Sequence, residues 1–287
     1  MSETTRKQPL EGRFDSHTLR QNRFSTIQSS SMRALVNLRT RNYPAHANVL
    51  QSGKDLIYTL GHISLKWTSR EMSVALLAPT VMKRIIIIDY GLGNLRSVTR
   101  GLERAGAQAE VTSEFSELAR ADGLVLPGVG AFKSGMRNIK DKKRALLRAV
   151  DEGTPVLGIC LGMQMLLTAS DEGRGESGPV EGLNLLTGHV KRFNFEATSE
   201  KLKIPHMGWN RLDVVKENAL IQGADGVYAY FVHSYYVEPG EHTVATSNYG
   251  TTFAAVVASG NVFGTQFHPE KSSSAGLQML KNFVEMC

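Results

Sequence analysis

The chain has 287 residues with two cysteines, and this length allows one large domain or two small ones. Its formal net charge of +6 belongs to residues 1–81, which hold 11 Lys and Arg against 5 Asp and Glu, whereas residues 82–287 hold 22 of each. Charge and composition therefore give no reason to expect that residues 82–287 bind nucleic acid, hold a metal ion or span a membrane.

Residues 1–81 precede the first patterned part of the chain. They are rich in Arg and Ser and carry little apolar periodicity, which fits a transit peptide, a disordered tail or sequence upstream of a misplaced translation start. With Glu3, Glu11 and Asp15, this segment holds more acidic residues than transit peptides usually do. Met82, in contrast, directly precedes an apolar run. We therefore expect a basic extension that is disordered or not native, followed by one cytoplasmic domain over 82–287; organelle import stays open.

From Lys83 onward, apolar strands alternate with amphipathic helices. Nearly continuous apolar runs such as "RIIIIDY" are typical of strands buried on both faces. In chain order the sequence predicts strands over 84–90, 109–112, 122–130 and 155–159, and helices over 94–106, 139–152 and 161–167. This alternation implies an α/β fold with a doubly wound, mostly parallel sheet.

After Gly173 the pattern changes to short strands separated by Gly-containing turns. They are predicted over 189–193, 210–215, 227–237, 242–249 and 253–269, the last with a hairpin turn at 259–261. A helix over 275–286 closes the chain. The C-terminal half is therefore expected to add an antiparallel part to the parallel sheet.

The first loop, "GLGN" (91–94), has the glycines of a dinucleotide-binding loop but not their full spacing. Arg96 stands where the third glycine of that fingerprint would be. The loop is therefore interpreted as a turn, and no cofactor is expected.

The stretch "GICLGMQML" (158–166) places Cys160 between an apolar strand and a helix. Gly158 and Gly162 let neighbouring elements approach closely, and a side chain at such an elbow is held out of the sheet. Backbone N–H groups at the helix start favour a thiolate and lower the cysteine pKa from a free value of ~8.5. Cys160 is thus a candidate nucleophile. The alternative is a buried structural cysteine. A disulfide is a poor explanation, because its one possible partner, Cys287, is the last residue.

The stretch "GTQFHPEKS" (264–272) supplies a candidate base. Pro269 ends the preceding strand, so His268 stands at a strand end, and Glu270 is spaced to accept a hydrogen bond from its imidazole. A cysteine nucleophile needs a base that is held in this way. An ordinary surface histidine is the alternative. With no third donor near them in sequence, His268 and Glu270 do not indicate a metal site.

A cysteine followed by His and Glu on a doubly wound sheet resembles the class I glutamine amidotransferases, whose triad has this order. Four more stretches are similar to one branch of that family, the glutaminase subunits of imidazole glycerol phosphate synthase. They are "DYGLGNL" (89–95), "PGVGAF" (127–132), "PHMGWN" (205–210) and "YFVHSYY" (230–236). The resemblance covers residues 82–287 and none of residues 1–81.

The resemblance implies hydrolysis of L-glutamine through a cysteinyl thioester. The implied triad is Cys160, His268 and Glu270. The implied oxyanion hole comes from the backbone of Leu161 and of the loop at Gly128, Val129 and Gly130, whose glycines let a peptide reorient on activation. The implied glutamine-binding residues are Gln164, Glu172, Ser234 and Tyr235.

The family also implies a partner, a (βα)8-barrel cyclase subunit that receives ammonia and forms imidazole glycerol phosphate and aminoimidazole carboxamide ribotide. The implied contacts with it are Asn94, Trp209, Tyr230 and Lys271. Each has a plain alternative: a helix cap for Asn94, half-buried core for Trp209 and Tyr230, a solvated charge for Lys271. Two alternative functions stay open, namely a glutaminase subunit of another ammonia-channelling synthase and a catalytically silent binding module of the same fold.

Overall fold

The computed structural model describes residues 82–176, 178–196 and 202–287, and the backbone of four strands between residues 47 and 77. The chain divides into two compact units, Met1–Val81 and Met82–Cys287. In the first unit an antiparallel sheet has the order β1-β2-β3-β4, formed by Ala47–Ser52, Asp55–Leu60, Ile63–Trp67 and Ala75–Leu77. The sequence pattern did not predict these strands. That residues 1–81 are disordered or not native stays a prediction.

The second unit is built on an eight-stranded sheet with the order β13-β16-β17-β18-β8-β7-β5-β6. Its strands in chain order are β5 (Arg84–Ile88), β6 (Gln108–Thr112), β7 (Gly123–Gly128), β8 (Val156–Cys160), β13 (Asp213–Val214), β16 (Thr243–Asn248), β17 (Thr252–Ser259) and β18 (Val262–Thr265). From β18 to β6 all neighbours are parallel, whereas β13, β16 and β17 pair antiparallel. The predicted α/β class, with a mostly parallel sheet and an antiparallel extension, is confirmed.

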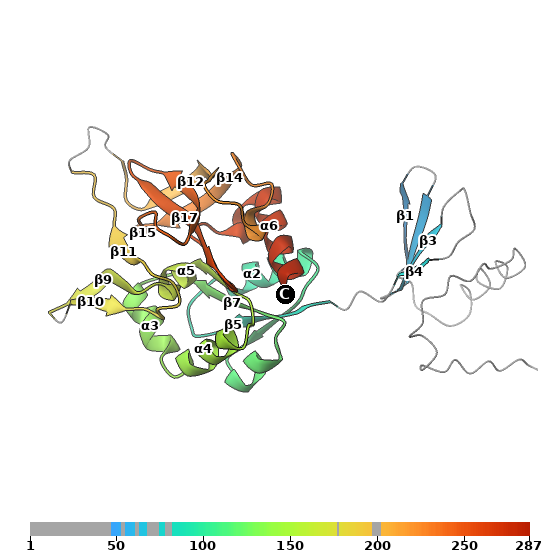
Figure 1. Ribbon diagram of the computed structural model, residues 1–287, viewed down its shortest axis with the longest axis horizontal. Helices are drawn as coiled ribbons and strands as arrows, with labels where there is room; N and C mark the ends of the chain where they lie inside the picture. Colours follow the sequence, from blue (N-terminus) through green and yellow to red (C-terminus); the bar gives the residue numbers. More distant parts are fainter. Residues whose placement is uncertain are drawn as a thin grey trace, which may run out of the picture. The chain divides into compact units, whose positions relative to one another are not determined.

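The isoleucine run of β5 explains why both faces of the sheet are covered. Side chains alternate along a strand, so Ile85 and Ile87 belong to one buried cluster while Ile86 and Ile88 belong to another. On the first face lie α2 (Leu95–Arg104) and α6 (Ser273–Met286), and on the second lie α3 (Phe132–Ile139), α4 (Lys143–Asp151) and α5 (Leu161–Leu166), as Figure 1 shows. Two separate cores therefore hold the sheet, as a doubly wound fold requires.

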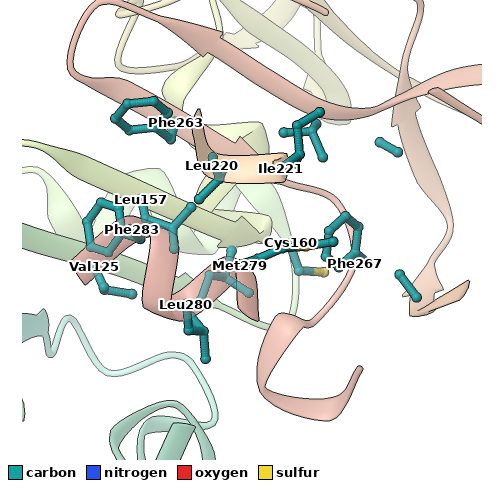
Figure 2. Packing of buried hydrophobic residues seen from close by; sticks show 14 of the residues in the cluster. Val125, Leu157, Cys160, Leu220, Ile221, Phe263, Phe267, Met279, Leu280 and Phe283 are labelled. Carbon is teal, nitrogen blue, oxygen red and sulfur yellow. The ribbon is translucent and has the colours of Figure 1, made fainter. Parts of the chain in front are cut away.

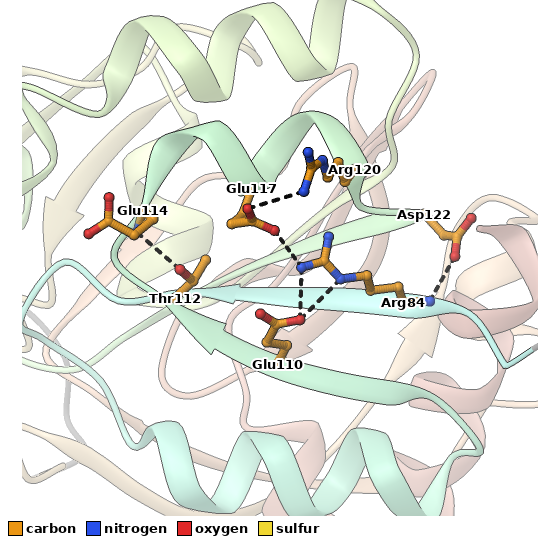
Figure 3. Close-up of polar contacts among 7 residues, drawn as sticks. All are labelled: Arg84, Glu110, Thr112, Glu114, Glu117, Arg120 and Asp122. Carbon is orange, nitrogen blue, oxygen red and sulfur yellow. Dashed lines mark hydrogen bonds and ion pairs between the residues drawn. The ribbon is translucent and has the colours of Figure 1, made fainter.

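The edge of the sheet at β6 is fastened by one arginine. The guanidinium of Arg84 donates to Glu110 on β6 at 2.8 Å and to Glu117 at 2.7 Å, in the short 3-10 helix η2 (Phe115–Arg120) (Figure 3). Because these side chains are only partly buried, the pairs position η2 over the edge more than they stabilise the fold.

Two smaller sheets stand beside the main one. The first has the order β10-β9-β11-β15, with β9 (Ala169–Gly175), β10 (Gly178–Glu181), β11 (His189–Arg192) and β15 (Tyr235–Val237). The second pairs β12 (His206–Arg211) with β14 (Tyr228–His233) in antiparallel register. The remaining 3-10 helices are η3 (Ala219–Ile221) and η4 (Pro269–Lys271). None of the described helices has the length and apolar character needed to cross a membrane.

Several predicted elements are divided where the chain changes sheet or direction. The helix predicted over 139–152 begins only at Lys143, because the charged residues 140–142 offer no apolar side chain to the sheet and form a turn. The strand predicted over 227–237 breaks at Ser234, between β14 of one sheet and β15 of another. The strand predicted over 210–215 breaks at Leu212 for the same reason. Helix α3 and strands β9 and β10 were not predicted.

Candidate active site

Cys160 lies at the elbow where β8 ends and α5 begins. Its backbone has φ 55° and ψ −108°, a left-handed conformation that residues with a side chain rarely adopt. Its side chain is buried at the edge of the cluster that also holds Val125, Leu157 and Met279 (Figure 2). A strained elbow of this kind presents a nucleophile at the end of a parallel strand, as the sequence predicted.

Two glycines make the elbow possible. A Cβ on Gly162 would collide with the carbonyl oxygen of Leu126 on the neighbouring strand, and a Cβ on Gly158 would lie 2.7 Å from the carbonyl carbon of Gly162. Helix α5 can therefore lie directly on β7 and β8 only because both positions lack side chains. The close approach expected from the sequence is confirmed.

His268 and Glu270 form a buried pair next to the end of β18. Nδ1 of His268 lies 2.8 Å from Oε1 of Glu270, and the two side chains are 2% and 0% exposed. A carboxylate can only accept, so Nδ1 carries a proton. Nε2 of His268 is buried and has no hydrogen-bond partner within the described residues. The imidazole is therefore oriented by Glu270 on one side, while Nε2 stays available for proton transfer, which is what a general base or acid requires.

The pKa of His268 reflects its place between an acid and a thiol. Burial alone would lower the pKa of this histidine, but interactions with Cys160 and Glu270 outweigh burial and raise the pKa to about 9. The imidazolium form of His268 is therefore favoured at neutral pH.

Two further groups contact the sulfur of Cys160, and the sequence did not reveal either. The Nε2 amide of Gln266, a fully buried side chain, lies 3.8 Å from Sγ, and so does the carbonyl oxygen of Val232 on β14. The strand predicted over 253–269 put Gln266 on the same face as His268, two residues later, so a signal for Gln266 was present although β18 ends at Thr265.

The loop after β7 begins beside the nucleophile. Gly128 is paired with Cys160 in the parallel ladder of β7 and β8, and a Cβ on Gly128 would lie 2.7 Å from Cβ of Leu161. Beyond it, Val129 and Gly130 are exposed, and Gly130 has φ +107°. The loop implied as an oxyanion site thus lies next to the reactive elbow.

The implied glutamine-binding residues fall on different elements. The Nε2 amide of Gln164 donates to Tyr235 O and to Gln266 Oε1, each at 3.0 Å, so it is linked to the nucleophile's surroundings. Glu172 lies on β9 and accepts from the backbone N–H of Phe132 at 2.8 Å. Ser234 stands between β14 and β15, with its carbonyl accepting from Phe193. The backbone groups of Ser234 and Tyr235 therefore serve the fold, and their role toward substrate stays a prediction.

In the described part of the chain, no group of three His, Cys, Asp or Glu side chains is arranged to hold a metal ion. Cys160 and Cys287 are both free thiols.

Comparison with known proteins decides the family. The model of the glutamine amidotransferase class-I family matches residues 86–287. Proteins named imidazole glycerol phosphate synthase subunit HisH are similar over nearly their whole length. Those of Natronomonas pharaonis and Halobacterium salinarum are 53% and 55% identical over 71% of this chain and 94% and 93% of theirs. That of Methanosarcina mazei is 50% identical over 72% of this chain and 100% of its own. The chain belongs to the class-I glutamine amidotransferases, in the HisH branch.

Solved structures give the same fold at lower sequence identity. A glutamine amidotransferase matches 70% of this chain and 97% of its own, with a TM-score of 0.54 and 19% identity. The structure of PurLQS from Thermotoga maritima matches 71% of this chain and 99% of its own, with a TM-score of 0.53 and 19% identity. The amidotransferase thus has the fold of its family, with the family match confined to the unit over Met82–Cys287.

Two of the four implied partner contacts of the amidotransferase, Trp209 and Tyr230, lie on the β12–β14 ribbon. Trp209 and Tyr230 face each other across the ribbon with ring centroids 6.0 Å apart, and Trp209 is 52% exposed. Met207 and Tyr228, which the sequence did not single out, are 63% and 59% exposed and lie on the same face. An exposed apolar face of this kind is typical of a protein interface.

The other two implied contacts, Lys271 and Asn94, lie outside this ribbon. Lys271 is exposed in η4, directly after Glu270, and the carbonyl of Tyr230 accepts from the backbone N–H of His268 at 3.0 Å. The exposed ribbon is therefore hydrogen-bonded to the segment that begins at His268. Asn94 is the N-cap residue of α2 and accepts from the backbone N–H of Val98 through its carbonyl, but its side chain makes no capping hydrogen bond.

Proposed function

We propose that this chain is the glutaminase subunit of imidazole glycerol phosphate synthase, with Cys160, His268 and Glu270 as its catalytic triad. The observation that carries the proposal is the buried histidine whose Nδ1 is bonded to Glu270, while Nε2 makes no hydrogen bond within the described part of the chain; its pKa is raised by interaction with Cys160, which lies at a strained elbow. Similarity to HisH subunits at about half identity supports the choice of enzyme.

Hydrolysis of glutamine begins with the thiolate of Cys160. Its sulfur attacks the carboxamide carbon of glutamine, and the carbonyl electrons move to oxygen to give a tetrahedral oxyanion. Backbone N–H groups of Leu161 and of the loop at Gly128–Gly130 stabilise that oxyanion. His268 donates the proton on Nε2 to the departing nitrogen, ammonia leaves, and a glutamyl thioester remains on Cys160.

Water then releases the product. His268, now neutral, accepts a proton from the attacking water, which displaces the thiolate and gives glutamate. Glu270 keeps the imidazole in the tautomer with its Nδ1 proton throughout, because its carboxylate can only accept. The raised pKa of His268 favours the protonated form in which ammonia departure needs it.

The released ammonia requires a partner. In water it would be protonated and lost as a nucleophile, so the reaction needs a sheltered acceptor. We assign that role to a (βα)8-barrel cyclase subunit, seated on the ribbon of Trp209 and Tyr230 together with Lys271 and Asn94. The exposed apolar side chains of the ribbon and its bond to the His268 segment support this assignment.

Residues 1–81 and the cellular location of the chain complete the proposal. Residues 82–287 hold the complete amidotransferase, and residues 1–81 contribute nothing to it; the family match, which begins at residue 86, supports this. A cytoplasmic location fits the two unpaired cysteines of the described chain, since reducing compartments keep thiols free.

The test uses Cys160→Ala in complex with the purified barrel subunit. Removing one sulfur from a side chain that is 7% exposed leaves little empty volume, so the complex still forms. Glutamine-dependent synthesis stops, whereas synthesis from added ammonia continues, because cyclisation takes place on the partner. A variant that still releases glutamate at the wild-type rate would show that Cys160 is not the nucleophile.

A further inference from the structure

The loop between β7 and α3 is fastened at its two ends and open between them. Val129, Gly130 and Ala131 are exposed, and a Cβ on Gly130 would meet only one atom, at 4.0 Å. Neighbouring side chains therefore do little to fix the middle of the loop. Its course next to Cys160 depends on what holds Gly128 on one side and Phe132 on the other.

Tyr90 holds the first end. Its hydroxyl donates to the carbonyl oxygen of Pro127 at 2.6 Å, and its side chain is 3% exposed. The same hydroxyl would lie 2.6 Å from a Cβ on Gly128, so ring and glycine are in direct contact. This bond joins the loop after β5 to the last residues of β7 and fixes the peptide that precedes Gly128.

Glu172 holds the second end. Its Oε2 accepts from the backbone N–H of Phe132, the first residue of α3, at 2.8 Å. Helix starts need an acceptor for their free N–H groups, and Ala131 at the N-cap has no side chain to supply one. A Cβ on the next residue, Gly173, would lie 2.8 Å from Cβ of Lys133, so β9 runs directly against α3.

We propose that Tyr90 and Glu172 position the oxyanion loop, and that Glu172 does so with the same carboxylate that the family resemblance implies for glutamine binding. The inference rests on the proposed function, since it concerns the same oxyanion site. Glu172 is thus a positioning residue as well as a substrate contact, and one side chain serves binding and transition-state geometry together.

The surroundings of Glu172 fit this double use. Burial raises the pKa of its carboxyl, and the bond from Phe132 opposes that rise. The backbone N–H of Phe132 is a neutral donor to this carboxylate and brings no positive charge to it. A substrate ammonium would add the positive charge that such a half-buried group lacks.

The experiment compares Glu172→Gln and Glu172→Ala in complex with the barrel subunit, with kcat and KM for glutamine measured separately. Glutamine at this position keeps an oxygen for the Phe132 N–H but loses the charge, so KM rises roughly tenfold while kcat stays near the wild-type value. Alanine loses both. Its kcat falls about 10²-fold, the effect of an ångström-scale displacement in an active site.

A second test variant and a control complete the design. Tyr90→Phe, which lacks only the hydroxyl, lowers kcat and leaves KM unchanged. The control is Asp171→Asn, a change in the neighbouring carboxylate on β9, which leaves both kcat and KM at the wild-type values. Equal kcat for Glu172→Gln and Glu172→Ala, with only KM altered, would refute the positioning role while the proposed function stood. A wild-type complex without glutaminase activity would refute the proposed function and this inference with it.

Discussion

Replacing Gly128 with alanine perturbs the contact between the oxyanion loop and the nucleophile elbow. The new Cβ would lie 2.6 Å from the hydroxyl of Tyr90, 2.7 Å from Cβ of Leu161 and 2.8 Å from N of Gly162. Carbon atoms settle at about 3.5–4.0 Å from their neighbours, so a shift of roughly 1 Å is needed. Leu161 and Gly162 directly follow Cys160, and any shift they make changes the elbow itself.

The size of both effects follows from that shift. Overpacking of this kind costs about 1–3 kcal/mol of unfolding free energy. For a unit of roughly 200 residues, each kcal/mol lowers Tm by about 2–4 °C, which gives a loss of roughly 2–12 °C. Displacement of the elbow by about 1 Å reduces kcat roughly 10²-fold.

The assay measures thermal unfolding of the chain and glutamine hydrolysis by its complex with the barrel subunit. Gly240→Ala is the matched control, because its Cβ meets nothing within 4 Å and no unusual φ is required there. The control is expected to keep the wild-type Tm and kcat. If Gly128→Ala also kept both, the close packing between loop and elbow would not govern the chemistry.

Four further outcomes are expected. In an NMR titration the pKa of His268, about 9 in the wild type, falls in Cys160→Ser, because burial still opposes the imidazolium and the sulfur no longer supports it; an unchanged pKa would contradict the interaction of His268 with the sulfur. Since this pKa is raised on folding, the stability it contributes is present below pH ~6.5 and is lost as pH rises through about 9, as thermal unfolding at several pH values would record. Trp209→Ala weakens binding of the barrel subunit in calorimetry without changing Tm, since its ring is half exposed; equal affinity would remove the ribbon from the interface. A chain of residues 82–287 alone keeps the wild-type glutaminase rate in the complex, whereas a large loss would show that residues 1–81 contribute.

The elbow at Cys160 and the bonded pair of His268 and Glu270 could be predicted, because each lies within a short stretch. Glycines two residues on either side of Cys160 indicated the elbow, and the Pro269 break with Glu270 two residues after His268 indicated the oriented base. Local spacing carries such information because a strand end and the turn after it determine where their own side chains point.

Contacts between distant segments could not be predicted. The bond from Tyr90 to Pro127 spans 37 residues and that from Phe132 to Glu172 spans 40, and each joins a side chain to a backbone group. Backbone groups have no sequence signature, so neither bond leaves a pattern to read. The division of one apolar run into β14 and β15 was hidden for a similar reason, since both strands are apolar and only the tertiary fold assigns them to different sheets.

The central claim is that Cys160 forms the covalent intermediate with glutamine, and a glutamine-like chloroketone tests it most directly. The chain offers an internal control, because burial raises the pKa of Cys287 to about 12 and keeps it a thiol at neutral pH. After treatment of the complex, peptide mass mapping is expected to find one adduct, on Cys160, with loss of glutaminase activity and protection by added glutamine. An adduct on Cys287 alone, or full activity with Cys160 modified, would contradict the account.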